Sequence, residues 1–355
     1  MKAKKLLIGS GITLVLMGGL LLETLQSAGV FRTIEPHFSG TCTRVNGVIG
    51  AEDITIDSAT GLAYISAMDR RALNATGKYD GGIYKYTPGS FQDPVKMEID
   101  ISENFHPHGI GLWKNENGND RLFVVTHPPQ ELDPSIATSQ VDVFEIDDDR
   151  LLHIRTIKPG TPVGLNDVTA AGSNSFYASI DQGSVTPLGQ TLETYGRLAR
   201  AGVMFGKDDQ MTQVLGDLIY ANGVQVSADK STLYVAETTG KHLSAYSINA
   251  ATGALSLQID QPINSGLDNI EIDEAGNLWV VGHPKTFDFL AHAGDAAKRS
   301  PSQIFKVNVS EKTMKATEIY LNDGNPISGA SVAAPIGGRF LVGSVFEPFI
   351  LDCSL

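Results

Sequence analysis

Oxygen-bearing and imidazole side chains recur at the start of similar short segments along the chain. The recurring residues are Glu52, Asp53, His108, Asn166, Asp167, Asn222, Asp268 and Asn269. Four of them are carboxylates and no Lys or Arg occupies an equivalent position, so a shared environment would force like charges together unless a cation neutralised them. Carboxylate and amide oxygens suit Ca²⁺, with about six to eight oxygen ligands, better than Mg²⁺ or Zn²⁺. The alternative is a set of solvated polar residues at strand starts.

Histidines form a second candidate group. His108 begins one recurring segment, and His127 follows the next apolar stretch of the same unit. If these stretches are antiparallel strands, both imidazoles lie at the same end of the unit, where a pair beside a metal can act as general base and helper. A structural role is the alternative for each, and it is the interpretation we adopt for His283. The chain has no Gly-x-Ser-x-Gly motif, which favours attack by water over covalent catalysis.

The polar positions belong to six repeats, each with an alternating stretch, a turn and a second apolar strand. Equivalent positions are 53, 108, 167, 222, 269 and 331, with a mean spacing of about 56 residues and a weaker sixth copy. Further strands fit at 82–86 and 95–99 in the first repeat, and at 140–146 and 152–157 in the second. This pattern predicts an all-β, six-bladed β-propeller with its innermost strands lining a central channel. Two β-sandwiches are the alternative, but they do not explain sixfold recurrence.

One stretch departs from the β pattern. Apolar residues at roughly helical intervals predict a surface helix over residues 188–205, between the third and fourth repeats. An amphipathic lid or a membrane-contact helix is the more specific alternative for the same stretch.

The composition limits the function classes. The chain has 355 residues with 27 Lys and Arg against 40 Asp and Glu, a formal net charge of −13. Apolar residues make up 42% and charged residues 19%, which is enough for a sizeable core and too little charge for a disordered chain. An acidic protein without a basic stripe is not expected to bind nucleic acid.

Only two cysteines are present, and they flank the globular part. Cys42 and Cys353 would close a very long loop if they formed a disulfide, which an oxidising compartment permits. Such a link would bring the two chain ends together, as a closed circular fold requires. Two unrelated buried thiols are the alternative.

The N-terminus has the pattern of a targeting segment. Three lysines precede an uncharged run over residues 6–22, which is short for a bilayer span and long for a signal-peptide core. Residues 1–26 are therefore expected to be a signal anchor or a cleaved signal peptide, and residues 27–355 a single propeller hydrolase domain. Either alternative places this domain outside the cytoplasm, periplasmic or secreted, and a retained segment would associate it with the membrane.

A set of motifs, in this order, resembles the paraoxonase/arylesterase family from residue 42 to residue 353. The motifs are His-Pro-His-Gly-Ile, Val-Val-Thr-His-Pro, Leu-Asn-Asp-Val, Tyr-Ala-Asn-Gly-Val, Leu-Asp-Asn-Ile, Leu-Trp-Val-Val-Gly-His-Pro and Phe-Leu-Val-Gly-Ser-Val-Phe. The resemblance implies a six-bladed propeller closed by a disulfide between its ends, with two calcium ions in the channel.

The resemblance also implies roles for individual residues. The catalytic calcium would be held by Glu52, Asn166, Asn222, Asp268 and Asn269. The structural calcium would be held by Asp53, Asp167 and the backbone carbonyl of Ile110. His108 matches the proposed general base and His127 its partner.

The implied activity is calcium-dependent hydrolysis of small carboxylic esters and lactones, with phosphotriesters as a side activity. Three segments depart from the vertebrate members: the charged loop 68–74, Gln182, and the stretch 183–206. These segments would form the mouth of the pocket, so substrate preference does not transfer. Two other functions compete: a non-catalytic calcium-stabilised binding propeller, and a related sugar-lactonase or strictosidine synthase-like enzyme. The sequence gives no indication of the oligomeric state.

Overall fold

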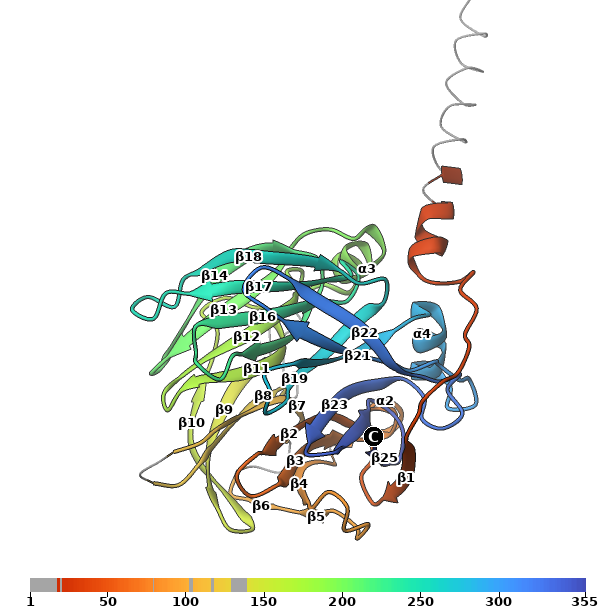
Figure 1. The fold of residues 1–355 in the computed structure, drawn as a ribbon. Helices are drawn as coiled ribbons and strands as arrows, with labels where there is room; N and C mark the ends of the chain where they lie inside the picture. Colours follow the sequence, from red (N-terminus) through yellow and green to blue (C-terminus); the bar gives the residue numbers. More distant parts are fainter. Residues whose placement is uncertain (1–17, 20, 79, 102–104, 116–117, 129–138) are drawn as a thin grey trace, which may run out of the picture.

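The computed structural model describes the chain except residues 1–17, 20, 79, 102–104, 116–117 and 129–138. Its described part contains six sheets, five with four strands and one with five. The innermost strands contact one another in a closed ring, in the order β2, β7, β11, β15, β19, β23 and back to β2. This ring confirms the predicted six-bladed propeller and excludes two β-sandwiches (Figure 1).

Each blade begins at the channel and proceeds outward through antiparallel strands. The innermost strands are β2 (Ala51–Asp57), β7 (Pro107–Trp113), β11 (Gly164–Gly172), β15 (Ala221–Val226), β19 (Gly266–Ile272) and β23 (Ala330–Ile336). The second strands are β3 (Leu62–Met68), β8 (Arg121–Thr126), β12 (Ser175–Gln182), β16 (Thr232–Glu237), β20 (Leu278–His283) and β24 (Arg339–Ser344). Both sets of strands lie where the sixfold pattern predicts them.

The outer strands complete the blades. They are β4 (Gly81–Tyr86), β5 (Val95–Lys96), β6 (Glu98–Ile99), β9 (Gln140–Asp147), β10 (Arg150–Ile157), β13 (Ala201–Lys207), β14 (Gln210–Leu218), β17 (His242–Ile248), β18 (Leu255–Pro262), β21 (Gln303–Val309), β22 (Met314–Leu321), β25 (Phe349–Ser354) and β1 (Thr41–Asn46). The expected single strand at 95–99 is wrong in one respect. It is split into β5, which pairs with β4, and β6, which pairs in parallel with β10 of the next blade.

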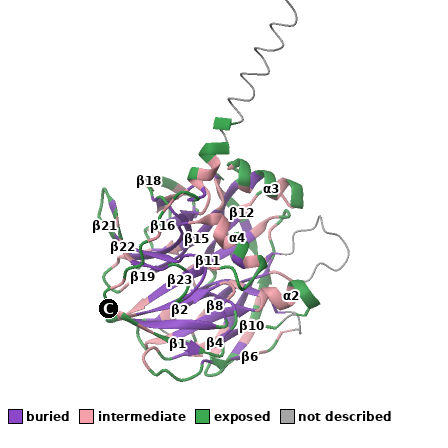
Figure 2. Ribbon diagram, turned by 90° about the vertical axis from the view of Figure 1, so that its right-hand side faces the viewer, coloured by how far each residue is buried: buried purple, intermediate pink, exposed green. Residues whose placement is uncertain are grey.

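The core lies between neighbouring blades. Ile54 of the first blade packs in one cluster with Val332 and Leu341 of the last blade, and Trp279 of the fifth blade stacks against Phe340 of the sixth at 5.1 Å between ring centroids. Figure 2 shows this burial along the strands, with exposed residues concentrated in the loops and helices. Each sheet therefore buries both faces, and the ring is stabilised by apolar burial all the way round.

The two ends of the chain meet in the last blade. Strand β1 pairs antiparallel with β25, with Cys42 opposite Cys353, and the two cysteines form a disulfide. The sheet order β1-β25-β24-β23 makes the N-terminal strand the outer edge of the sixth blade. The predicted disulfide is confirmed, and two separate thiols are excluded.

Three named helices lie outside the sheets: α2 (Arg70–Thr76), α3 (Pro187–Gly196) and α4 (Thr286–Gly294). The structure contains the helix that was predicted over 188–205, but this helix, α3, ends at Gly196. Arg197 adopts a left-handed conformation that ends α3, and Met204 pairs with Ala178 in the sheet as part of β13. Residues 201–204 are all buried, because Val203 packs in one core cluster and Met204 in another, so this strand is covered on both faces.

The N-terminal segment enters the described part as a helical stretch over residues 21–27. Figure 1 shows this stretch in red, beside α4, and the backbone N–H of Thr286 donates to the carbonyl of Ala28 at 3.0 Å. Most of the expected signal segment 1–26 lies outside the described residues. No helix within the described residues is long and apolar enough to cross a membrane.

Candidate metal centre and active site

Each of the six inner strands has a register shift near its start. The shifts lie between Ala51 and Asp53, Pro107 and Ile110, Leu165 and Val168, Ala221 and Val224, Leu267 and Ile270, and Ala330 and Val332. A β-bulge changes the direction of a side chain, so that two successive residues can serve one side of a sheet. This irregularity explains how the pairs Glu52–Asp53, Asn166–Asp167 and Asp268–Asn269 can each contribute both members to the channel.

The predicted ligands of the catalytic ion, here called the upper group, contain oxygens that have no hydrogen-bond donor. The group consists of Glu52, Asn166, Asn222, Asp268 and Asn269. Four buried oxygen atoms of this group lack a hydrogen-bond partner: Glu52 Oε2, Asn166 Oδ1, Asn222 Oδ1 and Asn269 Oδ1. The amide nitrogens of the same residues are satisfied, since Asn269 donates to Glu52 and Asn222 to Thr238, each at 3.1 Å. Buried polar atoms are almost always partnered. Four unpartnered hard oxygens in one predicted set fit a hard cation such as Ca²⁺.

The fifth member of the upper group is oriented by a histidine. His283 Nε2 lies 2.8 Å from Asp268 Oδ2, and both side chains are buried. Burial raises the pKa of Asp268, while the hydrogen bond from His283 opposes that rise. A partner that holds a carboxylate ligand in place tunes metal affinity. His283 was predicted to have only a structural role. Its place at the end of the second strand of its repeat, equivalent to that of His127, was a signal that could have identified it.

The predicted ligands of the structural ion, here called the lower group, lie further along the channel. They are Asp53, Asp167 and the backbone carbonyl of Ile110. The Asp53 carboxylate accepts backbone N–H bonds from Ile54 and, across the blade boundary, from Ile110 at 2.7 Å. Asp167 does the same with Val168 and Val224. Burial, followed by repulsion from neighbouring carboxylates, raises the pKa of both aspartates well above the ordinary value. Two buried carboxylates that repel each other are a suitable environment for a cation.

Neither group is a cluster rich in acids. Among the described residues no three His, Cys, Asp or Glu side chains are grouped as a ready metal site. In the predicted ligand sets amides outnumber the acids Glu52 and Asp268, and a backbone carbonyl joins Asp53 and Asp167, so these sets remain predictions.

The two predicted catalytic histidines are brought together. His108 Nδ1 lies 2.9 Å from His127 Nε2, and His127 Nδ1 lies 3.1 Å from Ser139 Oγ. The other nitrogen of His108, Nε2, lies 3.5 Å from Glu52 Oε1. Burial first, and then the neighbouring imidazole, holds the pKa of His127 well below its usual range. His127 is therefore neutral at pH 7, and the chain from Ser139 to His108 can leave Nε2 of His108 as the proton acceptor.

Two further charged residues adjoin this group and were not predicted as site residues. Burial raises the pKa of Asp181 to about 6, an effect opposed by His108 and by a hydrogen bond with Asn166. Arg70 donates to the carbonyls of Gly50 and Met68 at 3.4 Å and interacts electrostatically with Glu52. The charged loop 68–74 was noted as a departure, but no spacing rule connects residue 70 to the channel.

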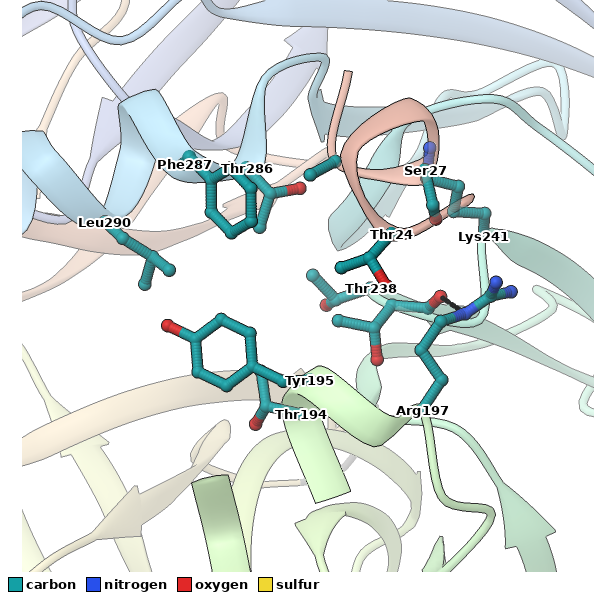
Figure 3. Close-up of a pocket in the computed structure, with 12 residues that line it drawn as sticks. Thr24, Ser27, Thr194, Tyr195, Arg197, Thr238, Lys241, Thr286, Phe287 and Leu290 are labelled. Carbon is teal, nitrogen blue, oxygen red and sulfur yellow. Dashed lines mark hydrogen bonds between the residues drawn. The ribbon is translucent and has the colours of Figure 1, made fainter. Parts of the chain in front are cut away.

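An apolar pocket lies where the N-terminal segment, α3 and α4 meet (Figure 3). Tyr195, Phe287 and Leu290 line one part of it, with about 460 Å³ of empty space including the open mouth. Thr238 also lines it and accepts the hydrogen bond from Asn222 described above. An apolar pocket thus adjoins a polar ligand set, which is the usual composition of a small-molecule site.

The fold and site define a six-bladed propeller whose channel combines buried oxygen atoms that lack donors with a half-buried pair of histidines in contact. Propellers of this class serve many functions, so the family must come from the residues themselves. The sequence model of the arylesterase family, described as "Arylesterase", matches residues 41–355. The chain belongs to this family and is therefore a carboxylic ester hydrolase by class.

Relatives of established name match almost end to end. Human serum paraoxonase/arylesterase 1 is 29% identical over 370 residues, covering 97% of this chain and 98% of that protein. Serum paraoxonase/lactonase 3 of Oryctolagus cuniculus is 28% identical, covering 95% of each chain.

Solved structures support the fold alone. A putative gluconolactonase aligns with a TM-score of 0.54 and 14% identity, covering 91% of this chain and 94% of its own. The calcium-binding protein regucalcin of Agrobacterium tumefaciens aligns with a TM-score of 0.52 and 14% identity, covering 89% and 93%.

Proposed function

We propose that this protein is a calcium-dependent hydrolase of small carboxylic esters and lactones, with phosphotriester cleavage as a side activity. The observation that carries the proposal is the set of four donor-free buried oxygens on Glu52, Asn166, Asn222 and Asn269. The printed names of the relatives, arylesterase and lactonase, support the substrate class.

Two calcium ions belong to this proposal. Glu52, Asn166, Asn222, Asp268 and Asn269 would hold the catalytic ion, which would polarise the scissile carbonyl and stabilise negative charge on its oxygen. Asp53, Asp167 and the Ile110 carbonyl would hold the structural ion. Both residue sets provide the oxygen atoms that calcium prefers and no thiolate.

The histidine pair supplies the proton transfer. His108 Nε2 accepts a proton from the attacking water, and its Nδ1–H remains directed at His127 Nε2, 2.9 Å away. His127 in turn is held by Ser139. A positioned base of this kind contributes about 10²–10⁴-fold to a rate. The low pKa of His127 keeps it an acceptor, so that the imidazolium formed at His108 is stabilised by a neutral partner.

The apolar pocket of Figure 3 suits the uncharged part of the substrate. Tyr195, Phe287 and Leu290 offer aromatic and aliphatic surface beside Thr238, which contacts Asn222. We assign the aryl or acyl group of the substrate to this pocket, because apolar groups gain free energy on leaving water.

The domain is further proposed to act outside the cytoplasm, with its N-terminal segment at a membrane. Leu21, Leu22 and Phe31 near the N-terminus are at least half exposed, as are Leu188 and Leu192 on α3. Exposed apolar side chains on helical segments favour contact with a lipid surface. The disulfide between Cys42 and Cys353 also suits an oxidising compartment.

The deciding experiment measures initial rates on phenyl acetate and on a medium-chain lactone with the full chain in mild detergent. The protein is assayed as prepared, after chelation, and after return of calcium or magnesium. We expect chelation to abolish both rates and calcium, but not magnesium, to restore them. Folded, calcium-loaded protein that leaves both substrates intact would refute the proposed function. The ratio of the two rates identifies the preferred substrate class.

A further inference from the structure

Further along each inner strand, past the β-bulge that carries the predicted ligands, a second layer of residues lines the channel. This layer is formed by Thr55, Gly111, Thr169, Gln225 and Glu271, which line one polar cavity together with Asp53, Ile110 and Asp167. Glu271 is the one carboxylate of this second layer. The cavity therefore contains the predicted ligands of the structural ion and one further acid.

Two other polar members of the layer, Thr169 and Gln225, are satisfied. Thr169 Oγ1 donates to Gln225 Oε1 at 2.8 Å and accepts from the backbone N–H of Val226 at 3.1 Å. The side chain of Glu271 makes no hydrogen bond or ion pair with another described residue, although Glu271 is only 8% exposed. Its charged neighbour is Asp53, which has the same sign. An unpartnered buried acid beside a second acid is unfavourable unless a cation lies between them.

The position of Glu271 in the ring complements the predicted ligands. Asp53, Ile110 and Asp167 come from β2, β7 and β11, three consecutive inner strands, whereas Glu271 comes from β19. In the ring order β19 lies opposite β7. The cavity has about 40 Å³ of room for solvent, more than the roughly 10–15 Å³ that one water needs. An ion held from one side thus has room for water on the side that faces Glu271.

We propose that Glu271 is a third carboxylate of the buried calcium site and acts on the ion through bound water. Water-mediated carboxylate ligands are ordinary in calcium sites. Direct ligation by three grouped acids is not required, in agreement with the absence of such a group among the described side chains. The three negative charges of Asp53, Asp167 and Glu271 would then hold the ion more tightly than the first two alone. This inference rests on the proposed calcium-dependent function.

The test compares Glu271→Gln with Glu237→Gln. Glu237 is also 8% exposed but lies on β16, where it accepts from the N–H of Ile219 outside the cavity. Calcium binding to the chelator-stripped full chain is followed by isothermal titration calorimetry, with circular dichroism as the check of folding. We expect Glu271→Gln to weaken one of two calcium sites about tenfold or more and Glu237→Gln to weaken neither. Glu271→Asp, which keeps the charge, should recover part of the affinity.

The outcomes separate this inference from the proposed function. If the wild-type chain binds no calcium, the proposed function itself fails. If the wild-type chain binds two ions and Glu271→Gln binds both with unchanged affinity, Glu271 has no part in the site. If Glu271→Gln unfolds on chelation, its calcium-loaded form is instead titrated with a competing chelator of known affinity, and affinities for both ions equal to those of the wild-type chain would overturn the assignment.

Discussion

At the scale of single residues, the channel is organised by unsatisfied oxygens and by paired imidazoles. Each amide of the upper group turns its nitrogen toward protein, as Asn269 does toward Glu52, and leaves its oxygen without a donor. Each imidazole of the site has a partner, with His283 on Asp268 and His127 on His108. In the proposed function these acceptors bind a cation, and the imidazole nitrogens transfer a proton or position a ligand.

The histidine pair leads to a prediction about rate. His108→Gln should lower kcat/KM for phenyl acetate by about 10²–10⁴-fold, because glutamine cannot accept the proton of the attacking water. His127→Gln should lower it less, since His108 retains its own acceptor nitrogen. His242 is an exposed histidine that forms a hydrogen bond with Asp260. The variant His242→Gln therefore serves as the control and should retain activity. Calcium affinity should be unchanged in all three variants, and an equal loss of rate in the control would contradict the assignment.

At the scale of elements, the inner strands approach each other closely where glycines replace side chains. A Cβ added at Gly223 would lie 2.6 Å from the carbonyl oxygen of Asp268 and 2.8 Å from the Cα of Asn269. The backbone of β15 is therefore packed directly against two predicted ligands on β19. This contact makes the positions of the ligands dependent on the fit between neighbouring blades.

Gly223→Ala should consequently disturb both stability and metal binding. We expect a loss of about 1–3 kcal/mol in the free energy of unfolding, because the added methyl group meets backbone that cannot move without its strand. Gly338→Ala is the control, since no atom lies within 4 Å of its added Cβ. Urea denaturation measures the stability and calcium titration the affinity. A Gly223→Ala protein as stable as the control would show that the blades can separate at this point.

Sequence patterns predicted the elements better than their irregularities. The recurrence of one pattern at a regular spacing was sufficient to locate β2, β7, β11, β15 and β19, because each inner strand occupies the equivalent place in its blade. The bulges were not predictable from one sequence. An extra residue in a strand only shifts the alternation of inward-facing and outward-facing residues by one position. The extent of α3 was overestimated because Leu198 and Met204 satisfy helical spacing, although Leu198 lies beyond the end of α3 and Met204 belongs to β13.

The same reasoning explains the residues that were found and missed in the site. Glu52, Asn166 and Asn222 were recognisable because they repeat at equivalent positions. Asp181 and Arg70 come from different places in their blades, and only the folded ring brings them near Glu52 and His108. Equivalence of positions between repeats does not reveal such contacts, because the residues in contact occupy different places in their blades.

At the scale of the whole molecule, the disulfide acts on the unfolded chain. Cys42 and Cys353 are 311 residues apart, and the chain-entropy model gives about 5–6 kcal/mol for a loop of this length, as an upper figure. Replacing both cysteines by alanine should lower the stability by several kcal/mol, measured by urea denaturation. Reduction of the wild-type protein should have the same effect, and the reductant should leave the variant unchanged. Equal stability with and without the bond would mean that strands β1 and β25 alone hold the ring closed.

Calcium and pH should act together on the stability of the ring. Burial and mutual repulsion raise the pKa values of Asp53, Asp167 and Glu271 well above ordinary values. The folded state then binds more protons than the unfolded state, so its stability falls as pH rises. Above about pH 6.5 the buried histidines no longer contribute to this dependence, because their pKa values are lowered.

The thermal midpoint in chelator should therefore fall between pH 6.5 and 8.5, whereas in saturating calcium it should stay nearly constant. The calcium-dependent increase in Tm consequently grows with pH. Differential scanning calorimetry at several pH values measures both curves. Parallel curves with and without calcium would rule out these carboxylates as the source of the coupling.

The pairing of β1 with β25 also sets the order of events when the protein is made. The outermost strand of the sixth blade leaves the ribosome before any other strand, and its partner at residues 349–354 leaves last. During synthesis the growing chain can stack its first five blades, but it can form only an open arc. Only when the last strand is in place are the inner strands, and the oxygens that they contribute, enclosed in a finished ring. Binding of the proposed calcium would in this sense be the final step of biogenesis, because a nascent chain stalled before residue 349 would carry all of the predicted ligands, which lie between residues 52 and 269, without the enclosure that makes them a site.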